Sequence, residues 1–383
     1  MTTELMDATK GALGPELVGK RVVVAMSGGV DSSLTAALLV EHGCEVIGVT
    51  MQIWEEQDPL EEAGYGGCCS LGAVHDARRV AYDLDIPYYV FNMRDVFREK
   101  VIEYFKQEYL RGRTPNPCVA CNQYIKFDAF LERAKALDAD YVATGHYANR
   151  SYDPVRERYL LIRAADQRKD QTYALYNITQ DQLAHAIFPL GRLTKSETRE
   201  LARQRGLTVA NKPESQEICF VKNNDYGSFL EEQVADEIRP GPMVDLEGNQ
   251  IGVHRGIPFY TIGQRRGLGI SSQEPLYVVD IEAETNTIRV GPKSALLQTT
   301  LVASKPNWIA IEKLDAPMPV QAKIRYNSPL YDAVVEPADD EGQTFRVRFL
   351  EPQRAITPGQ AVVLYQDDLV VGGGTIERVE HDS

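Results

Sequence analysis

The first 150 residues alternate between short apolar runs and helical patterns, and this alternation constrains the fold more than any other feature. Four runs rich in β-branched and aromatic residues predict strands at 21–26, 45–54, 86–93 and 141–147. Apolar residues spaced three and four apart predict helices between them, at 31–42, 73–84, 95–110 and 126–136. Strands this apolar must be covered on both faces. The pattern therefore predicts an α/β fold with a doubly wound parallel sheet.

The second half of the chain changes character. Residues 172–206 are again helical, but turns and short strands begin at about residue 240, and five further strand-like runs after 295 favour a small β-barrel. Because a single core stops growing at roughly 250 to 300 residues, the 383-residue chain should hold several domains. We expect an α/β domain at 1–215, a small central domain at 216–294 and a C-terminal β-barrel domain at 295–383.

The composition is that of a globular protein, with 43% hydrophobic and 25% charged residues. The N-terminal residues lack the apolar stretch of a secretory signal. The longest apolar runs are far shorter than the ~20 residues of a membrane-spanning helix. We therefore expect a cytoplasmic protein without membrane contact. In a reducing compartment the six cysteines are more suited to catalysis or metal binding than to a structural disulfide framework.

The formal net charge of −14 argues against broad, charge-driven binding of nucleic acid. Basic residues nevertheless cluster locally, at 111–113, 162–171, 192–206 and 263–269. Each cluster fits either a solvated surface or a local contact with phosphates.

The stretch AMSGGVDSS, residues 25–33, joins the first predicted strand to the first predicted helix. A glycine-rich turn at this point brings backbone N–H groups and the positive end of a helix to one spot, which favours an anion such as phosphate. The letters fit neither the P-loop nor the dinucleotide-binding pattern. Asp31 can cap the helix or help to hold Mg²⁺.

The motif SGGVDSS resembles the pyrophosphate loop of the ATP pyrophosphatase superfamily, whose members adenylate a substrate oxygen and have an adenine nucleotide alpha hydrolase-like fold. Further motifs, in order, are similar to those of the bacterial tRNA-specific 2-thiouridylase family: GRTPNPCVACNQYIKF, ATGHYA, KDQTYALY, PESQEICFV, FYTIGQRRGLGI and KIRYNSP. The resemblance runs from about residue 20 to about residue 375. It implies ATP-dependent 2-thiolation of the wobble uridine, position 34, in tRNAs for Lys, Glu and Gln.

The resemblance implies a site for ATP with Mg²⁺ at the carboxyl edge of the sheet. The residues it assigns to this site are Ala25, Met26, Ser27, Gly28, Gly29, Val30, Asp31, Ser32, Met51 and Gly145. Met51 could equally be a core residue, and Gly145 a simple turn.

It also implies a surface for the anticodon arm of tRNA, which reads unstacked loop bases. Asn116, Pro117 and Cys118 would face the target base. The further tRNA contacts would come from His146, Lys169, Asp170, Gln171, Arg325, Tyr326 and Gln360.

By the same resemblance, Cys121 is the catalytic nucleophile and Cys219 carries a persulfide. The sulfur would come from a donor protein, either a cysteine desulfurase or a sulfur-relay protein, and a Cys121–Cys219 disulfide would form as the sulfur departs. A thiolate near a helix N-terminus is activated, and Asn122 is a candidate cap for that helix. Cys121 could instead be half of a metal-binding C-x₂-C pair, and Cys219 a small buried hydrophobe.

Cys118 departs from the family pattern, because many members have Asp at this position. An acid–base role beside the uridine is then in doubt. Cys118, Cys121 and Cys219 could alternatively hold a [4Fe–4S] cluster with one open iron position. The persulfide route needs only the last two.

Two other classes of function share part of this pattern. Another adenylating enzyme, such as an amidotransferase, would have the SGGVDSS loop but would not need Cys121, Cys219 or the barrel. A non-catalytic RNA-binding protein would have the basic clusters but would not need the loop.

Overall fold

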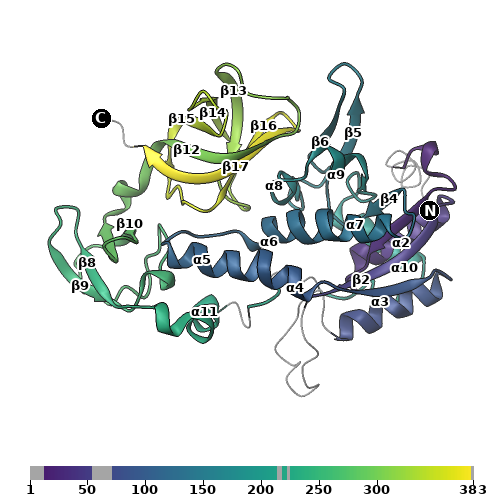
Figure 1. Ribbon diagram of the computed structural model, residues 1–383, viewed down its shortest axis with the longest axis horizontal. Coiled ribbons are helices and arrows are strands. Elements are labelled where there is room, and N and C mark those ends of the chain that lie inside the picture. Colours follow the sequence, from purple (N-terminus) through teal and green to yellow (C-terminus); the bar gives the residue numbers. More distant parts are fainter. Residues whose placement is uncertain (1–12, 54–70, 214–217, 222–224, 381–383) are drawn as a thin grey trace. The chain divides into compact units, whose positions relative to one another are not determined.

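The computed structural model describes residues 13–53, 71–213, 218–221 and 225–380 (Figure 1). The chain forms two compact units, each built from separated segments. The first combines described residues within Met1–Val101, Cys118–Asn224 and Asp368–Val370. The second combines Ile102–Pro117, Asp225–Asp367 and Val371–Ser383, again within the described ranges. The division into domains at 215 and 294 that the sequence predicts remains a proposal.

The first unit is built on a five-stranded parallel sheet of strand order β3-β2-β1-β4-β7. The strands are β1 (Arg21–Ala25), β2 (Glu45–Gln52), β3 (Tyr88–Asn92), β4 (Tyr141–Ala143) and β7 (Ala186–Ile187). The chain winds outward in one direction from β1 to β2 and in the other from β1 to β4. Ligands of open α/β sheets bind at such a switch point, beyond the carboxyl ends of the strands. This position is the end of β1, at Ala25.

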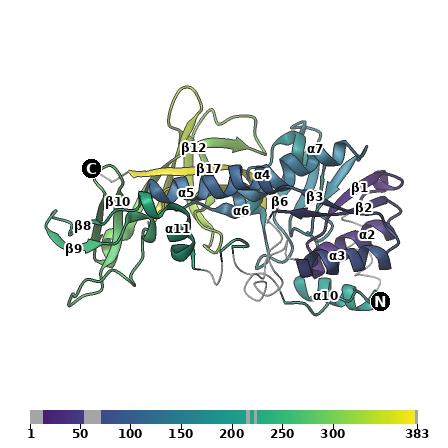
Figure 2. The same ribbon diagram turned by 60° about the horizontal axis from the view of Figure 1, so that its bottom comes forward.

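Helices cover both faces of this sheet, which confirms the predicted doubly wound α/β fold. In Figure 2, α2 (Val30–Glu41), α3 (Leu71–Asp83) and α10 (Lys195–Gln204) lie on one side of the strands, and α7 (Phe130–Lys135) lies on the other. The core between the strands and helices α2, α3 and α10 contains the buried residues Leu34, Leu38, Ala77 and Leu201. Burial of each of these leucine side chains contributes about 1.5 to 3 kcal/mol.

Two long helical segments contain π-helical turns. One consists of α4 (Arg94–Phe97), η3 (Arg98–Glu103) and α5 (Tyr104–Leu110). The other consists of α6 (Pro117–Ala120), η4 (Cys121–Ala129) and α7. This second helix begins nine residues before the predicted start at 126. Proline at the first helical position costs no hydrogen bond, so Pro117 starts the helix rather than excluding it.

Smaller elements complete the first unit. The hairpin of β5 and β6 was not predicted from the sequence. α10 begins with a capping box, in which the side chains of Thr194 and Glu197 each accept from the other residue's backbone N–H group. These elements are η1 (Pro15–Leu17), β5 (Asn149–Asp153), β6 (Arg158–Ile162), α8 (Thr172–Leu175) and α9 (Gln180–Ala184).

The second unit contains a small four-stranded sheet and the predicted barrel. The sheet has the strand order β10-β11-β8-β9 and packs around buried residues that include Ile257 and Phe259. Its elements are α11 (Tyr226–Val234), η6 (Ala235–Glu237), β8 (Gly241–Val244), β9 (Gln250–His254), η7 (Ile257–Phe259), β10 (Tyr277–Glu282), β11 (Thr287–Gly291) and η8 (Lys293–Leu296).

The barrel has six strands in the order β12-β15-β14-β13-β16-β17, and the pairing of β12 with β17 closes it. Inward-facing apolar side chains such as Val335 and Val347 fill its interior. The strands are β12 (Leu297–Trp308), β13 (Met318–Lys323), β14 (Tyr331–Pro337), β15 (Thr344–Arg354), β16 (Ala361–Gln366) and β17 (Leu369–Glu380). Over the described ranges of both units, no helix is long and apolar enough to cross a membrane.

Candidate functional site

The turn between β1 and α2 is the centre of the site, and its shape requires glycine. Gly28 has φ +65°, a conformation that side chains disfavour. A Cβ at this position would lie 2.3 Å from the carbonyl oxygen of Ala73 at the start of α3. The loop backbone therefore packs directly on the next helix.

Serine hydroxyls hold the loop closed. The Ser27 amide donates to Ser32 Oγ at 3.1 Å, and Ser32 Oγ donates to the carbonyl of Gly29 at 3.2 Å. The first N–H groups of α2 follow at once, and such groups lack acceptors within their own helix. The loop presents backbone donors and a helix N-terminus at the switch point of the sheet, which suits a phosphate group.

Gly145, two residues beyond the end of β4, packs against this helix start. A Cβ on Gly145 would lie 2.8 Å from the amide nitrogen of Ser32. The predicted loop and Gly145 therefore meet in space, although 113 residues of sequence separate Gly145 from Ser32. Gly145 is more than a turn residue, because backbone contact fixes the start of α2.

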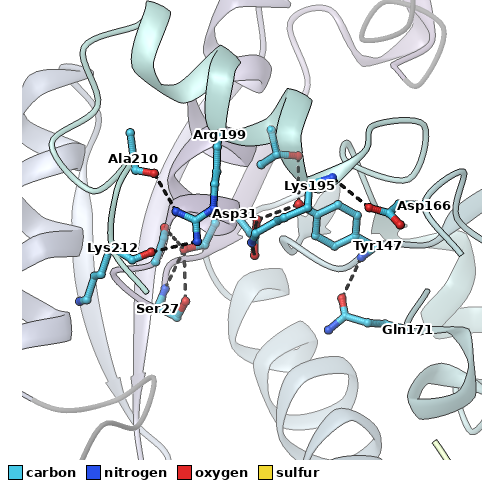
Figure 3. Close-up of polar contacts among 12 residues, drawn as sticks. Ser27, Asp31, Tyr147, Asp166, Gln171, Lys195, Arg199, Ala210 and Lys212 are labelled. Atoms are coloured by element: carbon cyan, nitrogen blue, oxygen red, sulfur yellow. Dashed lines mark hydrogen bonds and ion pairs between the residues drawn. The ribbon is translucent and has the colours of Figure 1, made fainter. Parts of the chain in front are cut away.

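The Asp31 carboxylate binds two side chains from later parts of the chain (Figure 3). Lys195 Nζ lies 2.7 Å from both carboxylate oxygens, and the Tyr147 hydroxyl donates to one of them at 2.9 Å. The cap of α2 is Gly29, and no side chain bonds to the first turn as a cap. The expectation that Asp31 could cap the helix is therefore wrong: its side chain points to Lys195 instead.

A second lysine reaches the loop from a later part of the chain. Lys212 Nζ donates to the carbonyl of Gly28 at 3.1 Å and to Asp76 at 2.6 Å. Arg199 holds this segment, because its guanidinium donates to the carbonyls of Ala210 and Lys212 (Figure 3). Two ammonium groups thus lie beside the loop, where they favour a bound anion.

Met51 is half-buried near the end of β2, the strand adjacent to β1. Its neighbour Thr50 donates to the carbonyl of Met26 at 2.7 Å and accepts from the Tyr88 hydroxyl at 2.7 Å. Both strand ends are thus linked at the edge where the loop begins. The contact of Met51 with adenine stays a prediction.

The helix that begins at Pro117 carries two of the predicted residues. Cys118 is exposed in the first turn, and Cys121 is half-buried at the start of the π-helical turn. Asn122 is buried and donates to the carbonyl of Ala174 at 2.9 Å. Its expected capping role is therefore wrong. The helix starts five residues earlier, and Asn122 instead anchors it to α8.

His146 follows Gly145 and is buried. Thr144 Oγ1 lies 2.7 Å from Nδ1, and Lys126 Nζ lies 3.4 Å from Nε2. Burial, with a smaller effect of the Lys126 charge, holds the pKa of His146 well below its ordinary value. The imidazole is therefore neutral near pH 7.

The run Lys169–Gln171 packs against the same strand end. The buried Asp170 carboxylate accepts from the Ala164 amide at 3.0 Å and from Thr172 Oγ1 at 2.7 Å. The Gln171 side chain accepts from the amide of Tyr147 at 2.9 Å. These hydrogen bonds fix the conformation of the loop beside the site. The contacts of Lys169, Asp170 and Gln171 with tRNA stay a prediction.

Three predicted tRNA contacts lie in the second unit. Arg325 and Tyr326 are exposed after β13. Gln360 Nε2 donates to the carbonyls of Thr114 and Pro115 at 2.8 and 3.3 Å. It therefore holds the chain immediately before Asn116 and Pro117, the residues expected at the target base.

Cys118, Cys121 and Cys219 are thiols in the structure. The expected Cys121–Cys219 disulfide is not formed in the structure. Across the described ranges, no three His, Cys, Asp or Glu side chains are close enough to hold a metal ion. The [4Fe–4S] alternative for Cys118, Cys121 and Cys219 stays a prediction.

Sequence reasoning missed Lys195, Lys212 and Tyr147. A signal for Lys195 was present, because the capping box of Thr194 and Glu197 places the lysine in the first turn of α10. No local signal pointed to Lys212 or to the hydroxyl of Tyr147, since their partners are more than 100 residues away.

Comparison with known proteins agrees with this geometry. The parallel sheet and its glycine loop define a HUP-type α/β domain. Residues 20–223 match the family described as the tRNA methyl transferase HUP domain. Residues 227–292 match the tRNA methyl transferase PRC-barrel domain, and residues 298–376 match the aminomethyltransferase beta-barrel domain.

Relatives with known names define the family more narrowly. The tRNA-specific 2-thiouridylase MnmA 1 of Thermoanaerobacter sp. is 60% identical over 358 residues, 94% of this chain and 98% of the relative. The MnmA proteins of Acetivibrio thermocellus and Clostridium perfringens are 56% and 55% identical, over 94% of this chain and 99% of each relative. The chain belongs to the tRNA-specific 2-thiouridylase family.

Proposed function

We propose that this protein is an ATP-dependent tRNA-uridine 2-sulfurtransferase that thiolates the wobble uridine, position 34, of tRNAs for Lys, Glu and Gln. One observation carries the proposal. Relatives named as tRNA-specific 2-thiouridylases are up to 60% identical over 94% of the chain, and the chain has each residue type that the chemistry requires. The protein would act in the cytoplasm on the anticodon arm of tRNA.

The first half-reaction would use ATP as a substrate at the loop Ser27–Gly29. The C2 oxygen of uridine attacks the α-phosphorus, the bond to pyrophosphate breaks, and an O-adenylated uridine results. Backbone N–H groups of the loop and the ammonium groups of Lys195 and Lys212 stabilise negative charge on the departing pyrophosphate. AMP then becomes a good leaving group from C2.

Mg²⁺ would accompany ATP, and the residues present fit this only in part. Asp31 is the loop carboxylate, yet both of its oxygens are bonded to Lys195. A Mg²⁺ ion here would take most of its ligands from phosphate oxygens and water, as is usual for this cation. Asp31 would then orient Lys195 or hold a Mg²⁺-bound water.

The second half-reaction would use both cysteines. A donor protein, either a desulfurase or a relay protein, delivers sulfur to Cys219 as a persulfide. The terminal sulfur attacks C2, AMP leaves with its bonding electrons, and the Cys121 thiolate attacks Cys219 Sγ, which breaks the persulfide S–S bond. The products are 2-thiouridine and a Cys121–Cys219 disulfide, which two external thiols reduce.

Mass spectrometry of tRNA from cells lacking this gene tests the function. We expect 2-thiouridine at position 34 to disappear and to return when the gene is restored. Persistence of that nucleoside in the absence of a second thiolating enzyme would refute the proposal. The mass also distinguishes thiolation from methylation, which the names of the matched domain families mention.

Purified protein separates the alternatives. A thiouridylase should release AMP and pyrophosphate only when tRNA is present, and should complete turnover only with a sulfur donor. An amidotransferase-type enzyme would release both without tRNA. A purely RNA-binding protein would release neither.

A further inference from the structure

The loop 263–269 displays two arginines whose charges have no partner within the described part of the chain. Arg265 and Arg266 are exposed. Neither guanidinium group makes a hydrogen bond or an ion pair with another described residue, whereas Arg113 and Arg346 each bind two carboxylates. Two adjacent guanidinium groups left in solvent are available for a ligand.

The backbone beneath these arginines is held rigidly. The Gln264 side chain accepts from the Thr261 amide at 3.1 Å and donates to the carbonyl of Arg266 at 3.0 Å. Gly263 and Gln264 bond to Val278 of β10, and Leu268 is buried in the core of the small sheet. A loop built only to connect two strands does not need these bonds, whereas a binding loop gains from preorganisation.

The loop borders a surface hollow of about 430 Å³ that is mostly polar in lining. Arg265, Gly267, Ser272 and Glu274 contribute to its wall. Arginine presents a planar fork that matches phosphate oxygens, and glycines let a backbone approach closely. The arginine and the glycines favour a phosphate group as the ligand. The Glu274 carboxylate in the same wall would repel it.

The start of this loop also contacts segments that hold residues predicted to bind tRNA. A Cβ on Gly263 would lie 2.9 Å from Ala355 Cβ, and Arg325 donates to the carbonyl of Ala355. Thr261 accepts from Thr114 Oγ1 at 3.2 Å, and Thr114 is held by Gln360. The start of the arginine loop therefore lies beside the segments that Arg325 and Gln360 contact.

We propose that Arg265 and Arg266 form a further RNA-binding site that grips the phosphodiester backbone of tRNA. The proposal rests on the proposed function, since it names a second contact for the same substrate. A phosphodiester backbone carries successive phosphates, so two neighbouring, exposed guanidinium groups can each contact one of them.

The test compares tRNA binding by the wild type and by Arg265→Ala/Arg266→Ala over a range of salt concentrations. The probe is an unmodified transcript of a lysine tRNA. We expect about tenfold weaker binding at low salt, and a log–log salt slope that is smaller by about 1 for each arginine. Arg265→Lys/Arg266→Lys should keep most of the slope and lose part of the affinity, because lysine lacks the bidentate fork.

A matched control removes the same charge elsewhere in the unit. Arg348→Ala/Arg378→Ala deletes two exposed arginines that pair with Glu336 and Glu380, and it should bind the transcript nearly as the wild type does. Equal weakening by both double variants would show a general charge effect and would overturn the proposal.

A second pair of variants tests for a change of tRNA affinity in the opposite direction. Glu274→Gln should tighten tRNA binding about twofold by removing repulsion, and the exposed Glu284→Gln should not. Inorganic pyrophosphate should not displace the transcript from the loop: displacement from the wild type but not from the alanine double variant would show a free-anion site and overturn the proposal.

Failure of the two proposals can be told apart. If the wild type thiolates and binds the transcript while Arg265→Ala/Arg266→Ala binds equally well, only the arginine site is refuted. If the wild type itself neither binds nor thiolates the transcript, the proposed function is refuted and the arginine site with it.

Discussion

The ammonium group of Lys195 lies 2.7 Å from both carboxylate oxygens of Asp31, and this pair joins the first turn of α10 to the first turn of α2. Tyr147 contacts both partners: its hydroxyl bonds to Asp31, and Lys195 Nζ lies 5.6 Å from the centre of its ring. The pair lies next to the phosphate-shaped loop. We therefore expect the pair both to stabilise the packing of α10 on α2 and to help to bind the phosphates of ATP.

Replacing either partner should impair ATP cleavage. We expect Asp31→Ala and Lys195→Ala to lower the rate of tRNA-dependent pyrophosphate release about 10²- to 10³-fold, the usual effect of losing one preorganised charge near a departing anion. The double variant should lose little more than the worse single one, because the two residues act together.

The control is a lysine–aspartate pair at the opposite edge of the same sheet. Lys20 Nζ lies 3.0 Å from Asp140, at the amino end of β1. Lys20→Ala should leave pyrophosphate release unchanged. Full activity of Asp31→Ala would mean that Asp31 has a structural role only.

Gly145→Ala should displace the start of α2. The added Cβ would meet the Ser32 amide and the Asp31 backbone at 2.8 and 2.9 Å, and backbone cannot rotate away as a side chain can. We expect a loss of about 1 to 3 kcal/mol in unfolding free energy, measured by urea denaturation, together with weaker ATP binding.

Gly227→Ala is its matched control. The nearest atoms to a Cβ there are ends of the Asp225 and Arg255 side chains at 3.3 and 3.4 Å, which can move. The same change should then be neutral within about 0.5 kcal/mol. Unchanged stability and ATP affinity in Gly145→Ala would show that the contact with α2 is not restrictive.

The cysteine variants distinguish the persulfide route from cluster chemistry. On anaerobic purification we expect no stoichiometric iron or sulfide. Cys121→Ala and Cys219→Ala should abolish 2-thiouridine formation, and Cys118→Ala should retain it. Iron bound in stoichiometric amount, lost together with activity in Cys118→Ala, would reverse our preference.

Acid should destabilise the protein in a way that depends on His146. Its pKa is held well below the ordinary value in the fold, whereas the unfolded chain takes up a proton near pH 6.5. Below that pH the unfolded state binds more protons, so the unfolding free energy falls as the pH drops.

His254 has a lowered pKa as well, mainly through burial, and should add to the same trend. His146→Gln should reduce the pH dependence of the unfolding free energy, measured by urea denaturation between pH 7.5 and 5.5. Identical pH profiles for the wild type and His146→Gln would contradict a neutral buried imidazole.

The central strands were predictable because they are continuous apolar runs. The expected strands at 21–26 and 45–54 correspond to β1 (Arg21–Ala25) and β2 (Glu45–Gln52). β7 was not predicted, since a two-residue strand leaves no periodic signal. The start of the helix at Pro117 was missed because the sequence PNPC has the composition of a turn.

The residues of the loop were evident from their letters, but their partners were not. Asp31 was assigned to the site, yet a cap and a Mg²⁺ ligand were the only roles that local sequence suggested. Its actual partner, Lys195, is 164 residues away. Ion pairs of this separation depend on the fold, and periodicity says nothing about which lysine will reach a given carboxylate.

The division of the chain between the two units limits which segments of two relatives can be joined in a working chimera. Ile102–Pro117 lie in sequence between two segments of the first unit but belong to the second. In the second unit, Arg113 binds Glu377, and Gln360 donates to the carbonyl of Thr114. A chimera of two relatives joined near residue 215 would pair this segment from one parent with a barrel from the other. Functional chimeras should therefore require that 102–117 be inherited with the C-terminal half, as a discontinuous block.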